Sequence, residues 1–204
     1  MKIKFATHSD IQKILDVQQA ALKEIRNEDM LVTLSEEEIT QNVNDGVLCI
    51  CQVDGRTAAF RSMHIPGEDY LGKYIALDPV DRDKLIYSDI TIVHPDYRGR
   101  GLQKVLGEWL FQAIDNKYKI IMATVHPDNI ASIKDKFHHG MKIVAIDNIY
   151  GEKVRYVFVL FRDKDCKNKD EVSVEMTDDK EIRRLLSEGY KGVALRNNLL
   201  IFTK

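Results

Sequence analysis

The chain has 204 residues and a mass of 23.5 kDa, which suits one large domain, alone or with a small appendage, better than two full domains. Its composition, 44% hydrophobic and 30% charged with four prolines, excludes disordered, collagen-like and disulfide-stapled proteins. With 30 Lys and Arg against 32 Asp and Glu, the net charge of -2 provides no general attraction to nucleic acid.

The amino terminus becomes polar too early for a signal peptide, and no apolar run is long enough to cross a bilayer. We therefore expect a cytoplasmic protein without a membrane partner. Cys49 and Cys51 lie in an apolar, strand-like run, where thiols serve as small buried side chains. Together with the odd third cysteine, Cys166, they predict no metal site.

The first 65 residues predict a strand, two helices and a β-hairpin. Two residue pairs have the spacing of the capping boxes that begin helices, Ser9 with Gln12 and Ser35 with Glu38. Asp54-Gly55 is a strong signal for a tight hairpin turn. The strands are expected at residues 3–6, 47–53 and 57–65, and the second helix is expected to end near Gly46.

Residues 66–84 mix Gly, Pro and acidic side chains without periodicity, which predicts a long loop of the kind that often carries substrate specificity. The pattern then sharpens into a β-branched strand at 86–94, a glycine-rich turn, and a helix whose apolar residues recur every three or four positions. The elements expected after this helix are a strand at 119–125, a short helix at 129–138, and strands at 141–146 and 154–161.

Residues 162–171 are largely charged and predict a solvated connector. The strand, helix and strand expected after it are too small to fold alone. We therefore divide the chain into a domain at 1–162 and an appendage at 163–204. The appendage is expected to dock on the main sheet or on a second copy of the chain, as in a homodimer.

The turn Arg98-Gly99-Arg100-Gly101 has the features of a diphosphate-binding site. The helix after it presents unpaired N–H groups and a partial positive charge, and the glycines let an anion approach the main chain. The two arginines add charge-assisted hydrogen bonds. The motifs of dinucleotide-binding folds and P-loops are absent. A solvated surface turn is the alternative for such a short motif.

Two segments together resemble the GNAT N-acetyltransferase superfamily. ITIVHPDYRGRGL, at residues 90–102, resembles the acetyl-CoA-binding segment, in which an apolar strand precedes R-x-x-G-x-G/A and a helix. Arg98 and Gly101 fill the first two motif positions, and Gln103 replaces the usual Gly or Ala. The resemblance covers residues 1–161.

The second segment, residues 126–141, resembles the family's later motif, N-x-x-S/A followed by a helix and Gly. Asn129, Ser132 and Gly140 fit this motif. Lys136 stands where many members carry a Tyr that acts as general acid.

The resemblance implies an α/β fold with a central mixed, mostly antiparallel sheet, splayed between strands 4 and 5, and helices on both faces. It implies transfer of an acetyl group from acetyl-CoA to a primary amine of a small molecule or peptide by direct attack. Since Gln103 and Lys136 depart from the pattern, a non-catalytic acyl-CoA-binding module of the same fold is the alternative. Nucleic-acid binding through the arginines would show steep salt dependence, and the acidic residues elsewhere disfavour it.

The resemblance also assigns the residues that contact acetyl-CoA. Main-chain groups of Ile92, Val93 and His94 would bind the pantetheine and thioester. The turn and the start of the helix after it would bind the pyrophosphate through Arg98, Gly99, Arg100, Gly101, Leu102 and Gln103. Asn129 and Ser132 would contact the cofactor from the opposite wall, or simply cap their helix.

An amine must lose a proton before it attacks, so a general base is needed. Asp89 is a carboxylate inside an apolar strand, and strand alternation predicts that it shares a face with Thr91 and Val93. We expect Asp89 to be this base. The alternative is an edge carboxylate that pairs with Lys84 or Arg61.

Overall fold

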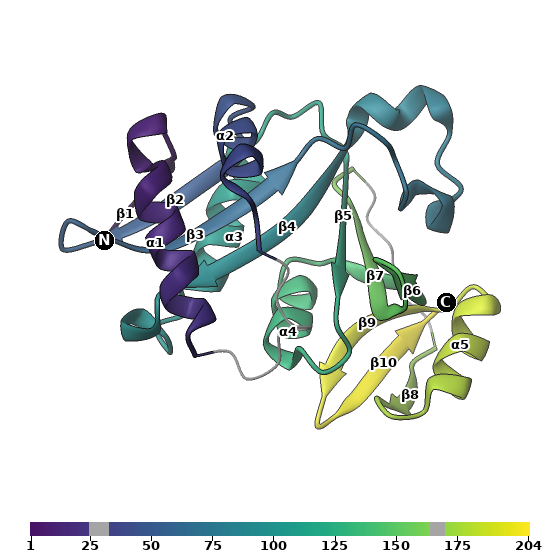
Figure 1. Ribbon diagram of the computed structural model, residues 1–204. Coiled ribbons are helices and arrows are strands. Elements are labelled where there is room, and N and C mark those ends of the chain that lie inside the picture. Colours follow the sequence, from purple (N-terminus) through teal and green to yellow (C-terminus); the bar gives the residue numbers. More distant parts are fainter. Residues whose placement is uncertain (25–32, 164–169) are drawn as a thin grey trace. The chain divides into compact units, whose positions relative to one another are not determined.

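The computed structural model describes residues 1–24, 33–163 and 170–204 (Figure 1). It divides into two compact units, unit 1 with residues Met1–Ile65 and Ile86–Asn116, and unit 2 with residues Pro66–Leu85 and Lys117–Lys204. Each unit combines helices with a sheet, which confirms the expected α/β class. None of the helices in the described ranges is long and apolar enough to cross a membrane.

Unit 1 is an antiparallel sheet with strand order β1-β2-β3-β4, and helices cover both of its faces (Figure 1). Its strands are β1 (Lys2–Phe5), β2 (Leu48–Val53), β3 (Arg56–His64) and β4 (Leu85–Val93). Its helices are α1 (Ile11–Leu22), α2 (Glu36–Asn44) and α3 (Leu102–Ala113), with short 3₁₀ turns η1 (His8–Asp10) and η5 (Pro95–Tyr97).

The core of unit 1 lies between the sheet and helices α1 and α2. It consists of Ala6, Ile14, Val17, Ala21, Ile39, Leu48, Ile50, Phe60 and Ile92. On the opposite face, the Arg61 guanidinium of β3 lies 4.9 Å from the ring centroid of Phe111 in α3. Because β4 contributes Ile92 to the core and pairs with β3 along its length, the start of the turn after β4 is held in place by packing.

Of the two predicted helix caps, one is confirmed and one is wrong. Ser35 begins α2 as expected, since its hydroxyl accepts the Glu38 N–H and its own N–H donates to the Glu38 carboxylate. The capping box expected at Ser9 and Gln12 is wrong. The N–H and hydroxyl of Thr7 donate to the buried Asp10 carboxylate instead, because a 3₁₀ turn precedes α1 and moves the cap toward the N-terminus.

The hairpin between β2 and β3 is confirmed. Asp54 and Gly55 take left-handed φ values of 49° and 78°, which a tight two-residue turn between antiparallel strands requires. Cys49 and Cys51 are buried in β2, and burial raises the pKa of the Cys49 thiol to about 12. These thiols are therefore packing groups, while Cys166 lies outside the described residues.

The strands of unit 2 pair antiparallel with one another in the order β5-β7-β6-β9-β10-β8 (Figure 1). Its strands are β5 (Ile120–Val125), β6 (Lys142–Ile149), β7 (Lys153–Phe161), β8 (Val172–Glu175), β9 (Lys191–Arg196) and β10 (Leu199–Thr203). Its helices are α4 (Ile130–His138) and α5 (Asp179–Ser187), and residues 66–84 carry two 3₁₀ turns, η3 (Gly72–Ile75) and η4 (Pro79–Lys84).

The C-terminal residues continue the sheet of unit 2, as one of the two docking alternatives predicted. Ile143 of β6 pairs with Gly192 of β9, a strand that the sequence pattern missed. The Arg183 guanidinium of α5 donates to the carbonyl oxygen of Ile146 at 2.8 Å. The domain boundary near residue 163 stays a prediction, and the connector lies largely in residues 164–169, outside the described part.

Candidate functional site

A β-bulge interrupts β4 in the middle of its pairing with β3. The register shifts there, and the pairs on either side of the shift are Arg61 with Thr91 and Met63 with Ser88. Two residues of β4, Asp89 and Ile90, therefore lie opposite the single residue Ser62 of β3. Such an extra residue bends the strand and changes which face each following side chain takes.

The bulge overturns the expected placement of Asp89 on the same face as Thr91. The Asp89 carboxylate contacts Nδ1 of His64, at the end of β3. His64 shares a face with Ser62, whose hydroxyl accepts a hydrogen bond from Asn42 of α2. Thr91 pairs with Arg61, which packs toward α3 on the other face. The inserted residue breaks the alternation on which the expectation rested.

His64 and Asp89 form a partly buried pair of titratable side chains. Sequence reasoning missed His64. The rings of His64 and Tyr87 pack edge to face, with centroids 5.2 Å apart and an interplanar angle of 88°. Burial lowers the pKa of His64, but the hydrogen bond and charge of Asp89 and the charge of Glu38 outweigh it, so the pKa lies above its ordinary value of 6.5. No local motif links two residues 25 positions apart, so only the strand register could have revealed this pair.

At the end of β4, the main-chain N–H and C=O groups of successive residues do not all face the neighbouring strand β3. The His94 N–H donates to the carbonyl oxygen of Ala58 at 2.8 Å, and the His94 carbonyl accepts the Tyr97 N–H at 2.9 Å. Because the hydrogen-bonding direction alternates along an antiparallel ladder, Val93 turns its N–H and C=O away from β3. Of the three residues assigned to the pantetheine, Ile92 to His94, Val93 is therefore the one oriented away from the neighbouring strand.

The turn after β4 is open around its glycines. Gly99 and Gly101 have φ values of 75° and 70°, in the left-handed region that favours glycine. No described heavy atom beyond their chain neighbours lies within 4 Å of the position that a Cβ would take on either residue. The space next to this main chain can accommodate an anion in close contact, as the sequence motif predicts.

Helix α3 begins directly at this turn, with Gly101 as its N-cap. Among the described residues no side chain caps it, so its first N–H groups lack the usual side-chain acceptor. The Leu102 side chain is buried, and the Gln103 carbonyl accepts a 3.4 Å hydrogen bond from Arg61. These two residues fix the first turn of the helix in unit 1 and leave its N–H end to bind an anion.

The two arginines of the turn are held at the surface by weak contacts. The Arg98 guanidinium lies 2.6 Å from a carboxylate oxygen of Glu24, and both side chains are about half exposed. The Arg100 guanidinium stacks over the Tyr97 ring at 5.0 Å and donates to the Asp96 carbonyl at 3.4 Å. Exposed ion pairs contribute roughly 0 to 1 kcal/mol, so both cations can be redirected to a bound phosphate.

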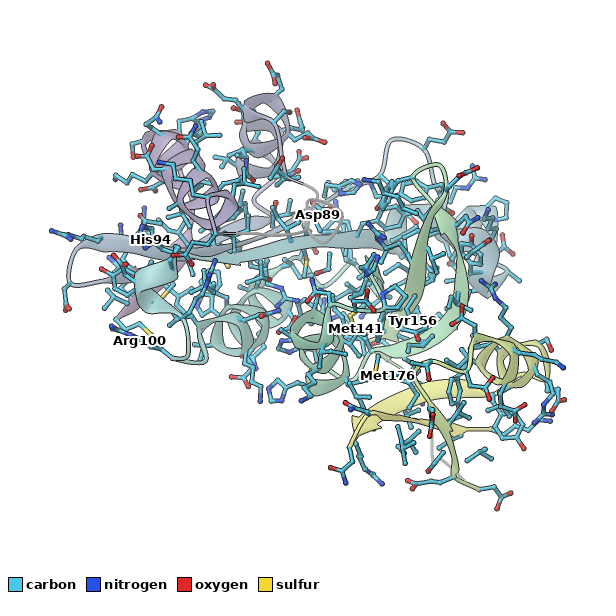
Figure 2. The ribbon with its side chains drawn as sticks, turned by 60° about the horizontal axis from the view of Figure 1, so that its bottom comes forward. Asp89, His94, Arg100, Met141, Tyr156 and Met176 are labelled. Atoms are coloured by element: carbon cyan, nitrogen blue, oxygen red, sulfur yellow. The ribbon has the colours of Figure 1, made fainter. Side chains whose placement is uncertain are left out.

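Asn129 and Ser132 lie in unit 2, at the start of α4. The Asn129 carboxamide oxygen accepts the Ser132 N–H at 3.1 Å, which is the capping arrangement offered as the alternative to cofactor contact. Lys136 is buried in the same helix, with its ammonium 3.8 Å from the carboxylate of Asp135. The structure thus brings the residues of β4, the turn and α3 together within unit 1, with Asp89 farther along the strand (Figure 2).

Comparisons with known proteins identify a family and a fold. Residues 11–135 match the model of the acetyltransferase (GNAT) family. No curated protein matches the chain in sequence. The structure of yncA from Salmonella typhimurium, solved with its cofactor acetyl-CoA, is 17% identical with a TM-score of 0.60, and the match covers 83% of this chain and 98% of that one.

Two further solved structures are similar to the same degree. The ribosomal-protein-alanine N-acetyltransferase from Brucella melitensis is 18% identical with a TM-score of 0.60, over 79% of this chain and 99% of that one. The ribosomal-protein-S18-alanine N-acetyltransferase from Escherichia coli is 17% identical with a TM-score of 0.60, over 83% of this chain and 98% of that one. At these identities the likeness establishes the fold.

Proposed function

The chain belongs to the GNAT acetyltransferase family, and we propose that it transfers the acetyl group of acetyl-CoA to a primary amine of a small molecule or peptide. The observation that carries this proposal is the turn at residues 98–103. Its left-handed glycines, the open space beside them and the uncapped start of α3 fit the diphosphate of coenzyme A. The solved neighbours with N-acetyltransferase names support the amine as acceptor.

The remaining contacts with acetyl-CoA follow from the order of its parts. The diphosphate occupies the turn, where Arg98 and Arg100 add charge-assisted hydrogen bonds. The pantetheine extends back along the end of β4, with Val93 as its main hydrogen-bonding partner. Asn129 and Ser132 cap α4, and their contact with the cofactor stays a prediction from the resemblance.

The chemistry requires a base more than an acid. An alkylamine with a pKa of roughly 10.4 must lose a proton at neutral pH, which costs about 4 to 5 kcal/mol. A thiolate with a pKa near 8.5 needs only about 2 kcal/mol by the same arithmetic. A thiolate can therefore leave without a Tyr at position 136, whereas proton removal from the amine calls for a group such as Asp89.

The test is turnover of acetyl-CoA with a panel of amines, followed as release of free thiol and by the mass of the acetylated product. The panel includes polyamines, amino acids and peptides with an N-terminal alanine, the last because of the names of two structural neighbours. Acceptor-dependent release at a rate above hydrolysis is expected. Saturable binding of acetyl-CoA without release for any amine would refute catalysis and leave a binding module.

A further inference from the structure

We propose that His64 is the group that takes the proton from the acceptor amine, and that Asp89 is a positioning residue that acts through it. This inference rests on the proposed acetyl transfer and deepens it. It replaces direct proton removal by the carboxylate with a two-residue relay built across β3 and β4.

The contact between the two side chains determines which nitrogen is available. Nδ1 of His64 faces the Asp89 carboxylate, which can only accept a hydrogen bond while it is ionised. The proton of the neutral imidazole is therefore held on Nδ1, and Nε2 carries the lone pair that accepts a proton. The edge-to-face contact with Tyr87 fixes the ring in this orientation.

Exposure separates the roles of the two residues. The His64 side chain is 34% exposed and the Asp89 side chain only 12% exposed. An amine that arrives from solution therefore reaches the imidazole before the carboxylate. Asp89 is better placed to orient the ring and to stabilise the imidazolium once it forms.

Basicity also favours His64 over Asp89 as the group that takes the proton from the amine. A carboxylate with an ordinary pKa near 3.9 lies about 6.5 units below an alkylamine, whereas an imidazole near 6.5 lies about 4 units below. The groups that face His64 are Asp89 and Tyr87 on β4 and Glu38 on α2, and the two acids shift its pKa further toward that of the amine. His64 is thus a stronger base than an isolated Asp89 would be.

Position along β4 supports the same assignment. In acetyl-CoA the thioester is at the far end of the pantetheine from the diphosphate. With the diphosphate at residues 98–103 and the pantetheine beside Val93, the reactive end points back along β4 toward the bulge at Asp89 and Ile90. Figure 2 shows His94 and Arg100 at one end of unit 1 and Asp89 farther along the strand.

The step is balanced without any further reactant. The ammonium gives a proton to Nε2 of His64, and the nitrogen lone pair attacks the thioester carbon. The C–N bond forms and the C–S bond breaks, and the sulfur leaves with the bonding electron pair as a thiolate. The surplus protons pass from the imidazolium and the new amide nitrogen to the thiolate and to water.

The test compares His64→Gln, Asp89→Asn and the control His8→Gln, which changes an exposed histidine of unit 1. In wild type, kcat/KM should rise with pH through the pKa of His64. His64→Gln should lower kcat/KM by about 10²- to 10⁴-fold and remove this ionisation. The dissociation constant of coenzyme A, measured by calorimetry, should stay within twofold.

Asp89→Asn should lower kcat/KM less and move the ionisation to lower pH, because it removes a charge that raises the pKa of His64. Added imidazole should partly restore a His64→Ala variant. If the pair were merely structural, the His64 and Asp89 variants would lose thermal stability without a change in the pH profile, and His8→Gln would keep both. If wild type turns over and His64→Gln keeps both its kcat/KM and its pH profile, the inference about His64 fails and the acetyltransferase proposal survives. If wild type shows no turnover, both proposals fail.

One measurement does not depend on the variants folding. Nitrogen-15 NMR of wild type reports the tautomer of each histidine. A neutral His64 protonated on Nδ1 agrees with the relay, whereas protonation on Nε2 overturns it because that nitrogen could not accept the proton.

Discussion

Substitution of one glycine in the turn can separate anion binding from backbone strain. Gly101→Ala places a methyl group where the diphosphate is proposed to approach, in a residue with φ of 70°. Gly46→Ala is the matched control, because Gly46 has φ of 66°, lies in the same unit, and also has open space around its Cβ position. Both variants therefore impose similar strain, and only one of them changes the proposed site.

The expected magnitudes follow from that geometry. A left-handed conformation costs an alanine roughly 1 to 2 kcal/mol, and the stiffer unfolded chain returns about 0.4 to 1 kcal/mol. Each variant should thus lose about 1 kcal/mol in free energy of unfolding, measured by urea denaturation. Calorimetry should show at least tenfold weaker binding of coenzyme A, which is about 1.4 kcal/mol, for Gly101→Ala alone. Dissociation constants that agree within twofold between the two variants would refute the assignment of the turn.

Three further substitutions test separate parts of the structure. Glu24→Gln removes the exposed partner of Arg98 and should strengthen coenzyme A binding up to a few fold, by calorimetry, with unchanged stability. Tyr156→Phe should leave stability unchanged or raise it by about 1 kcal/mol in urea denaturation, because its buried hydroxyl has no hydrogen-bond partner among the described residues; a clear loss would reveal a bound partner. Burial would raise the pKa of Asp10, but hydrogen bonds from Lys4, Thr7 and Lys13 hold it below the ordinary 3.8. Asp10→Asn should therefore cost about 1.5 to 3 kcal/mol at pH 7, the range for hydrogen bonds to a charged group. This difference should shrink as the pH falls below 3.8, and a difference that is independent of pH would contradict the ionic explanation.

Elements with strong local signals could be predicted from the sequence. The Asp54-Gly55 hairpin and the Ser35 cap each depend on residues at most three positions apart, and both are confirmed. The strand β9 could not be recognised because Lys191–Arg196 begins and ends with a charged residue and contains Gly192. It pairs with a distant partner, Ile143, whose Cβ lies 3.1 Å from the position that a Cβ would take on residue 192. A side chain at position 192 would crowd Ile143, so glycine suits the close packing of the two strands.

In the candidate site too, features set by neighbouring residues could be predicted, and features set by distant strands could not. The turn at residues 98–103 could be identified because strand, glycines, arginines and helix are contiguous in the chain. The face of Asp89 could not, since β3 and β4 are joined by residues 65–84 and no tight turn sets their register. A single inserted residue then moves Asp89 from the side of Thr91 to that of His64. The parts of a site that bind a diphosphate through main chain are local, whereas a proton relay depends on how two distant strands align. The pairing register of β3 and β4 is therefore the feature that the sequence alone does not predict, and the proposed proton relay depends on it.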